Sequence, residues 1–122
     1  MKILLDEQLP VKLKYRFNPE LYVSTVKDEQ WLGVKNGVLL QLALSNEFSV
    51  FITNDHNISH QQSLSQFKML FININQPFNR YEDVLPAILI IKAWLIKNKE
   101  DVALIIAERN YVIYPEDFAV QP

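Results

Sequence analysis

Two aspartates follow short apolar segments of the chain and are candidates to bind a divalent cation. Asp6 stands directly after Ile3–Leu5, and Asp55 comes two residues after the segment 49–53. A continuous apolar run of this length is typical of a strand that is buried on both faces of a parallel sheet. Mg²⁺ and Mn²⁺ prefer carboxylate oxygens, so two strand-end aspartates predict metal-assisted chemistry. The simpler interpretation of Asp6 alone is that it starts a turn and caps the following helix.

The two aspartates can meet only if their strands end at the same edge of one sheet. Besides the strand at 3–5, β-rich apolar segments predict strands at 21–26, 49–53 and 69–74. Helices are predicted at four places, after Pro10, at 37–45 with Asn36 as its cap, at 59–66 and at 82–97. This alternation with short connections predicts a right-handed, mainly parallel α/β sheet. The carboxyl ends of parallel strands share one edge, so Asp6 and Asp55 are expected to face one crevice.

The length and composition of the chain limit its class. With 122 residues, 49% of them hydrophobic and 21% charged, the chain has room for one domain, 1–122, with one core. The lack of cysteine excludes disulfides and thiolate sites and is typical of a cytoplasmic protein. A net charge of −2 argues against binding to nucleic acid by bulk charge, so any such contact needs a local patch or a bridging metal. We expect no signal peptide and no membrane span, because the apolar segment 84–96 is too short to cross a bilayer.

The long helix predicted over 82–97 is apolar on two sides. One stripe contains Leu85, Ile88, Leu89 and Leu95, and the other contains Ala87, Ile91 and Trp94. A helix that is apolar on two sides needs cover on both. One stripe is therefore predicted to face the sheet and the other a second copy of the chain, as a homodimer interface. The alternative cover is a C-terminal β-hairpin, which the segments 102–107 and 111–114 predict.

Three stretches, taken in order, resemble the short single-domain PIN-like proteins, which are relatives of the PIN-domain ribonucleases and toxins. In Lys2–Pro10 a hydrophobic strand leads into Asp-Glu-Gln-Leu-Pro, and in Val50–Asn57 a second one leads into Thr-Asn-Asp. The third stretch is Thr25–Leu42, and Asn79-Arg80 after the fourth predicted strand also fits. The resemblance covers nearly the whole chain and implies a three-layer α/β/α sandwich.

The resemblance also implies an activity, a metal-dependent endoribonuclease in which three or four acidic residues surround Mg²⁺ or Mn²⁺. Residue by residue, Asp6 and Asp55 match acids of the pattern and are the predicted catalytic and metal-binding residues. Glu7 and Asn79 match accessory positions. The implied partners are RNA and, for a toxin of a toxin–antitoxin pair, a cognate antitoxin. A bound cation lowers the pKa of its water, and a pair of cations can clamp the attacking and leaving oxygens.

One position departs from the family pattern. The family usually carries Glu or Asp at the start of the second helix, and the matching residue here is Val38. No acid occurs between Glu29 and Glu47, so only Asp28 or Glu29 from the preceding loop could replace it. Loss of one carboxylate weakens the binding of a cation. The alternative function is therefore a degenerate PIN-like module that binds or regulates without hydrolysis.

Other polar residues have two interpretations each. His56 and His60 are four residues apart, a spacing that can hold a metal on a helix, although exposed histidines without a third ligand are the simpler interpretation. Lys12, Lys14 and Arg16 either meet a phosphate backbone or form a solvated helix face. A receiver-like phosphoacceptor is a third functional class, but it needs a lysine directly after a later strand, and none follows the segment 69–74.

Overall fold

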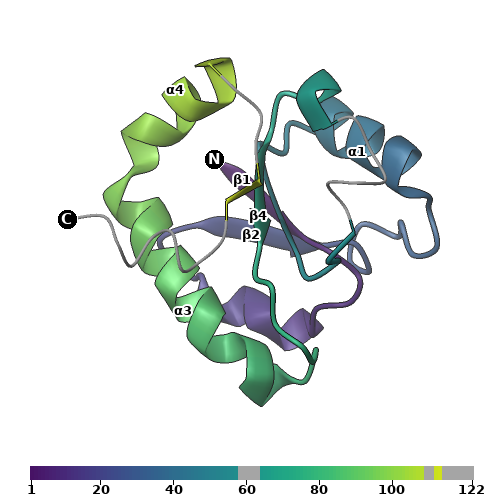
Figure 1. Ribbon diagram of the computed structural model, residues 1–122, viewed down its shortest axis with the longest axis vertical. Coiled ribbons are helices and arrows are strands. Elements are labelled where there is room, and N and C mark those ends of the chain that lie inside the picture. The colour runs from purple at the N-terminus through teal and green to yellow at the C-terminus, as the bar shows by residue number, and fades with distance from the viewer. Residues whose placement is uncertain (58–63, 109–111, 114–122) are drawn as a thin grey trace.

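The chain folds around a parallel sheet, as seen in a computed structural model that describes residues 1–57, 64–108 and 112–113 (Figure 1). The strands are β1 Lys2–Leu5, β2 Tyr22–Thr25, β3 Val50–Thr53, β4 Leu70–Asn73 and the two-residue β5 Val112–Ile113. All pairings are parallel, and the order across the sheet is β2-β1-β3-β4-β5. The predicted parallel α/β architecture is confirmed.

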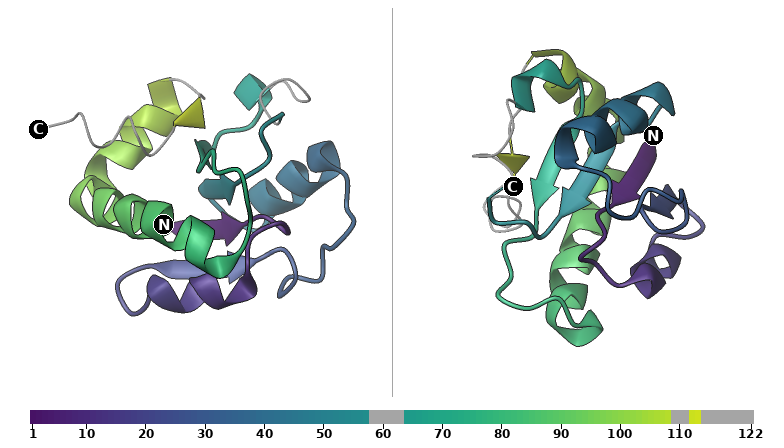
Figure 2. Two further views of the ribbon diagram at one scale, coloured as in Figure 1. Left: turned by 60° about the horizontal axis from the view of Figure 1, so that its bottom comes forward. Right: turned by 90° about the vertical axis from the view of Figure 1, so that its right-hand side faces the viewer.

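Helices cover both faces of the sheet. They are the 3₁₀-helix η1 Val11–Arg16, α1 Asn36–Ser45, the 3₁₀-turn η2 Leu64–Gln66, α3 Tyr81–Lys97 and α4 Lys99–Glu108. Most of the helix predicted at 59–66 lies outside the described residues, and η2 is its described end. Figure 2 shows α3 and α4 on one side of the strands and α1 on the other. The layers are therefore helix, sheet and helix.

Strands β1, β3 and β4 are buried on both faces, because successive side chains point to opposite sides and both sides are covered. In β1, Ile3 and Leu5 join the core under α3, while Leu4 joins the core under α1. β3 and β4 repeat the pattern with Phe51 and Phe71 on the α1 side, where their rings meet edge to face. This explains why the strands are continuous apolar runs, and it confirms their prediction.

Helix α1 begins one residue before the predicted range. Lys35 occupies the N-cap position, and its carbonyl oxygen already accepts the N–H of Leu39 at 2.8 Å. The prediction that Asn36 is the cap is wrong, because the backbone of Asn36 is the first helical one.

The predicted C-terminal hairpin is also wrong. Residues 99–108 form α4, and β5 pairs in parallel with β4, with Phe71 opposite Val112. A parallel partner requires a crossover, and α3 with α4 provides it. The sequence is compatible with a helix, because Glu100 and Asp101 lie in its first turn, where acids are favourable. Among the side chains of α4 whose burial is described, Val102 is the buried one, and Ile105 and Ile106 pack against the same core.

The second stripe of α3 faces the core rather than a second copy of the chain. Ala87, Ile91 and Trp94 are all buried in the cluster between the sheet and α3, so the prediction that they form a dimer interface is wrong. Both predicted stripes pack in or against this cluster except for Leu89, which is exposed. Within the described part of the chain, no helix combines the length and hydropathy that a membrane span requires.

Neighbouring isoleucines in α3 test this orientation. Ile91 is 0% exposed and Ile90 is 44% exposed. We expect Ile91→Ala to lower the free energy of unfolding by about 2–5 kcal/mol, because it opens a cavity in the core. Ile90→Ala is the matched control and should change it by less than about 0.5 kcal/mol. Urea unfolding measures both, and equal losses would contradict the observed rotation of α3.

Candidate functional site

The candidate site lies where the direction of the chain across the sheet reverses. From β1 the chain crosses to β2 on one side, and it later returns to β3 on the other side of β1. In open parallel sheets, ligands bind at such a switch point, outside the carboxyl ends of the strands. Asp6 follows the carboxyl end of β1, and Thr53 is the last residue of β3. The two predicted strand ends are therefore neighbours.

The buried polar residues of the described chain gather at this edge. There are six of them, each at or directly after the last residues of a strand: Asp6, Ser24, Thr25, Thr53, Asn54 and Asn73. A buried polar group lowers stability unless it is hydrogen-bonded, so such groups are normally scattered and few. Their concentration at one sheet edge makes this edge the candidate site.

Thr53 joins the two predicted metal ligands. Its hydroxyl donates to Oδ2 of Asp6 at 2.7 Å and accepts the backbone N–H of Asp55 at 3.0 Å. The other Asp6 oxygen, Oδ1, accepts the backbone N–H of Glu7 at 2.8 Å. The Asp6 side chain is therefore held by one bond on each oxygen, and each oxygen keeps a further lone pair for a ligand.

The pKa of the Asp6 carboxyl is raised above its usual range of about 3.8, first of all because the side chain is buried. The hydrogen bonds from Thr53 and the Glu7 backbone act in the opposite direction, because they stabilise the charged form. The Glu7 and Asp55 carboxylates raise the pKa further by repulsion. Because the Thr53 hydroxyl contacts both residues, Asp6 and Asp55 lie close enough for their charges to interact.

Asp55 is held by the turn that follows β3. Its side-chain Oδ1 accepts the backbone N–H of Asn57 at 3.0 Å, and its backbone oxygen accepts Nδ2 of Asn73 at 2.9 Å. The adjacent Asn54 side chain accepts the backbone N–H of Gln76 at 2.9 Å. Amide side chains from the ends of β3 and β4 thus hold both turns together.

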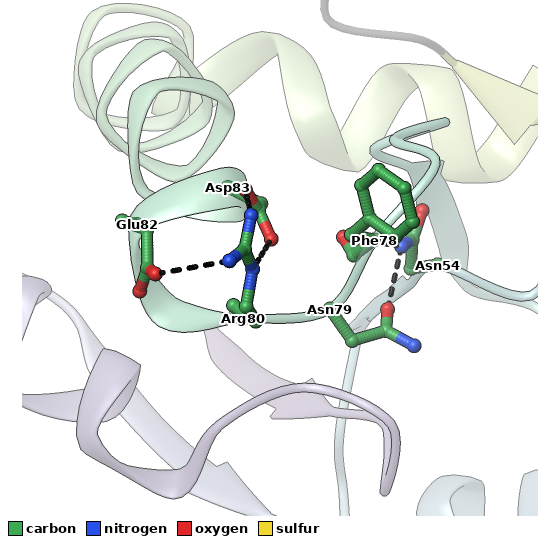
Figure 3. Close-up of polar contacts among 6 residues, drawn as sticks. All are labelled: Asn54, Phe78, Asn79, Arg80, Glu82 and Asp83. Carbon is green, nitrogen blue, oxygen red and sulfur yellow. Dashed lines mark hydrogen bonds and ion pairs between the residues drawn. The ribbon is translucent and has the colours of Figure 1, made fainter.

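Asn79 reaches this network from the segment before α3. Asn54 Nδ2 donates to Asn79 Oδ1 at 2.6 Å, and the amide nitrogen of Asn79 points away from Asn54 (Figure 3). The neighbouring Arg80 turns the other way and pairs with Asp83, with Nε 2.7 Å from Oδ2. The structure therefore brings the predicted accessory residue Asn79 to the candidate site, whereas it holds Arg80 in an ion pair.

The other acids near this edge are engaged elsewhere. Glu7 is exposed, and its Oε2 accepts the Gly33 N–H at 3.4 Å. Asp28 pairs with Lys14 at 2.7 Å, and Glu29 accepts the Ser24 hydroxyl at 2.7 Å. In the described residues, no group of three or more acidic, histidine or cysteine side chains is arranged to hold a metal ion.

Val38 lies in the first turn of α1, on the same edge of the sheet, because α1 runs from the end of β2 towards the start of β3. Its side chain is 58% exposed. The histidine pair is not assembled by the described residues either. His56 is exposed with Nε2 2.9 Å from the Gln76 carbonyl oxygen, and His60 lies outside the described residues.

The residues present suit a cation that binds together with a phosphate. Asp6 and Asp55 offer hard oxygen ligands, and no ion pair to either carboxylate is formed within the described ranges. Mg²⁺ typically keeps several waters and is bound by one or two carboxylates plus substrate phosphates, without a complete cage of protein ligands. Two aspartates without a third ligand fit that mode.

Sequence reasoning identified the acids but did not identify the residues that position them. Thr53, Asn54 and Asn73 organise the site from the ends of β3 and β4. The available signal was polar residues that interrupt or end apolar β-rich runs, because such positions fall at the carboxyl edge of a parallel sheet. The strand ends give no support to the receiver-like alternative, because β4 and β5 are followed by Ile74 and Tyr114 rather than by the lysine that it needs.

Comparisons of the chain with protein-family models, with curated proteins and with solved structures find no match.

The raised pKa of Asp6 predicts how stability depends on pH. The native state binds the Asp6 proton more tightly than the unfolded state, so the free energy of unfolding falls as the pH rises from about 3.8 through the raised pKa. Asp6→Asn lacks this proton. We therefore expect the wild type to lose stability relative to Asp6→Asn between pH 4 and pH 7, as measured by urea unfolding at each pH.

Asp83→Asn is the control with the opposite sign. Its hydrogen bond to Arg80 lowers the pKa of Asp83, so the stability that it contributes is present above about pH 3.8 and is lost below it. The difference between wild type and Asp83→Asn should therefore stay constant between about pH 5 and pH 7 and shrink below that range. A constant difference for Asp6→Asn as well would contradict the raised pKa.

Proposed function

We propose that the chain is a metal-dependent endoribonuclease of PIN-like type, in which Asp6 and Asp55 bind Mg²⁺ or Mn²⁺ together with a phosphate of an RNA strand. The observation that carries this proposal is the gathering of the six described buried polar residues around the switch point. Burying polar side chains costs desolvation free energy, so apolar residues would stabilise this edge better if its role were only to hold the fold together. A ligand-binding site would explain why polar residues are buried at this edge.

Each residue of the site has a role in this proposal. Asp6 and Asp55 hold the cation, and Glu7, which is exposed beside Asp6, supports it as an accessory carboxylate. Asn79 directs its amide nitrogen away from Asn54, so it is available to donate to a phosphate oxygen. When bound, the cation lowers the pKa of a water and offsets the charge of the phosphate. Pairing with an antitoxin stays a prediction of the family resemblance, and a cytoplasmic location stays a prediction from the lack of cysteine.

Mn²⁺ titration and RNA cleavage test the proposal together. A cation relieves the repulsion between Asp6 and Asp55, so Mn²⁺ should raise the Tm of the wild type by an amount equivalent to about 0.4–1.4 kcal/mol at one to ten times its Kd. Asp6→Asn and Asp55→Asn should show much smaller shifts and cleave single-stranded RNA only at background. Asp101→Asn, an exposed acid on α4, is the matched control. Equal shifts in all four proteins would remove the site from consideration.

A second candidate function is a degenerate module that binds RNA or a regulatory partner without hydrolysis. Two observations favour it, namely Val38 in place of an acid and the lack of a three-ligand group among the described residues. The fold and the positioning of Asp6 are the same in both candidates. They differ only in whether two aspartates suffice for cleavage.

Val38→Glu separates the two candidates. Val38 is exposed, so the exchange should change stability by less than about 0.5 kcal/mol, and an anion in the first helical turn is favourable by about 0.3–1 kcal/mol. If the chain is a nuclease disabled by one missing ligand, the variant gains Mn²⁺ affinity and RNA cleavage. Gln41→Glu adds the same charge one turn later and is the control. Strong metal-dependent cleavage by the wild type would instead exclude the degenerate module.

A further inference from the structure

A groove between η1 and the start of α3 brings two cations and two phenol rings together. It has a volume of about 560 Å³ and is lined by Lys12, Tyr15, Arg16 and Tyr81. Small-molecule sites typically have volumes of about 300–1,000 Å³. We refer to these four residues as the η1 groove.

The 3₁₀ geometry of η1 explains part of this arrangement. In a 3₁₀-helix, side chains three residues apart are eclipsed, so Lys12 and Tyr15 lie in one row. Leu13 is fully buried and anchors η1 in the core. Lys14 is not among the lining residues: its Nζ forms an ion pair with Asp28 at 2.7 Å and lies 5.3 Å from the centroid of the Tyr15 ring. Of the three cations of η1, Lys14 is therefore paired with an acid, whereas Lys12 and Arg16 line the groove.

The cations of the groove are not neutralised by the protein. Within the described part of the chain, neither Lys12 nor Arg16 forms an ion pair, whereas Lys14 and Arg80 each lie 2.7 Å from an aspartate oxygen. A guanidinium offers forked donors that match a phosphate, and an ammonium adds a point charge. On a chain of net charge −2, two unpaired cations at one groove form a local surface for an anion.

The rings make a nucleotide a better ligand than an acidic peptide. Tyr15 is 64% exposed, and Tyr81 is half-buried at the first turn of α3. A solvent-exposed aromatic ring next to a phosphate-binding cation is a stacking surface for a base. An acidic peptide would be attracted by Lys12 and Arg16 but would leave both rings without a matching group.

The groove is continuous with the candidate site along the chain. η1 begins soon after the corner that contains Asp6, and Tyr81 comes two residues after Asn79. η1 and α3 also pack against each other. Both elements that line the groove therefore begin shortly after chain segments that contribute to the candidate site.

We propose that the η1 groove binds one nucleotide of a single-stranded nucleic acid, with its phosphate on Lys12 and Arg16 and its base against Tyr15 and Tyr81. This inference rests on the proposed function and states how the substrate strand is held. A single strand is required because the bases of a duplex are paired and stacked and cannot lie against the rings. The bound nucleotide would also fix the position of the strand relative to the carboxylates.

Fluorescence anisotropy with labelled hexauridine RNA, and with a DNA hexamer of thymidine, tests the groove. The buffer contains EDTA, so the measurement does not depend on a metal. Tyr15→Ala should weaken binding by about 5- to 100-fold, as expected for the loss of one stacking ring, and Tyr15→Phe should retain it. Lys12→Ala with Arg16→Ala should weaken binding and reduce the salt slope by roughly 0.7 for each phosphate that the protein no longer neutralises.

Tyr22→Ala and Lys97→Ala are the matched controls, because both side chains are exposed and lie outside the groove. They should bind both oligonucleotides as the wild type does. Tighter binding of RNA than of DNA would show that the 2′-hydroxyl contributes, and equal binding would show that the groove takes either strand; both results support the proposal.

Wild-type affinity in the groove variants would overturn the proposal. Displacement of the RNA by a polyglutamate peptide, together with unchanged RNA binding in Tyr15→Ala, would overturn it in favour of an acidic peptide site. The proposed nuclease function can fail separately. If RNA binding in EDTA depends on the groove but no RNA is cleaved in Mn²⁺, the nuclease proposal fails and the groove proposal stands. If RNA is cleaved but the groove variants bind it as the wild type does, the groove proposal fails and the nuclease proposal stands.

Discussion

The hydroxyl of Thr53 is the contact on which the candidate site depends. It donates to the carboxylate of Asp6 and accepts the N–H of Asp55, and so it fixes both acids across the boundary between β1 and β3. Thr53 is fully buried, so this geometry is held by the sheet rather than by a surface loop. A hydrogen bond to a charged group contributes about 1.5–3 kcal/mol, which offsets part of the cost of burying Asp6. This hydrogen bond requires that β1 and β3 are neighbours in the sheet, as they are.

The charges of this edge are sorted by local pairing. Asp28 is paired with Lys14, and Glu29 accepts the hydroxyl hydrogen of Ser24. The same ion pair removes Lys14 from the cations of the η1 groove. A negative site and a positive groove can therefore lie on adjacent segments without neutralising each other. In the proposed function, this separation lets a strand of nucleic acid place a phosphate on the groove while another phosphate meets a cation held by the aspartates.

The crossover from β4 to β5 accounts for the shape of the rest of the chain. α3 buries two apolar stripes against the sheet and η1, and α4 continues the cover and returns the chain to the edge beside β4. Asn79 and Tyr81 stand at the start of this crossover, so the helix that stabilises the core also brings one residue to the candidate site and one to the groove. Exchanges deep in α3 would therefore affect function indirectly, through the position of its first turn.

The elements that could be predicted from the residue order are those whose signal is local. Continuous apolar runs predicted β1, β3 and β4. The end of a buried strand is visible in the sequence as an abrupt change from apolar to polar residues, and this change drew attention to Asp6 after β1 and to Asp55 after β3. Periodicity likewise predicted α3. Which segment covers each apolar side of α3 depends instead on tertiary packing. The segment 102–107 contains β-branched residues, which favour strands, yet it is helical, because it belongs to the crossover from β4 to β5 and buries Val102 in the core. The roles of Thr53 and of the η1 groove could not be predicted either, because each depends on segments that are distant in the sequence and meet only when the sheet order is fixed.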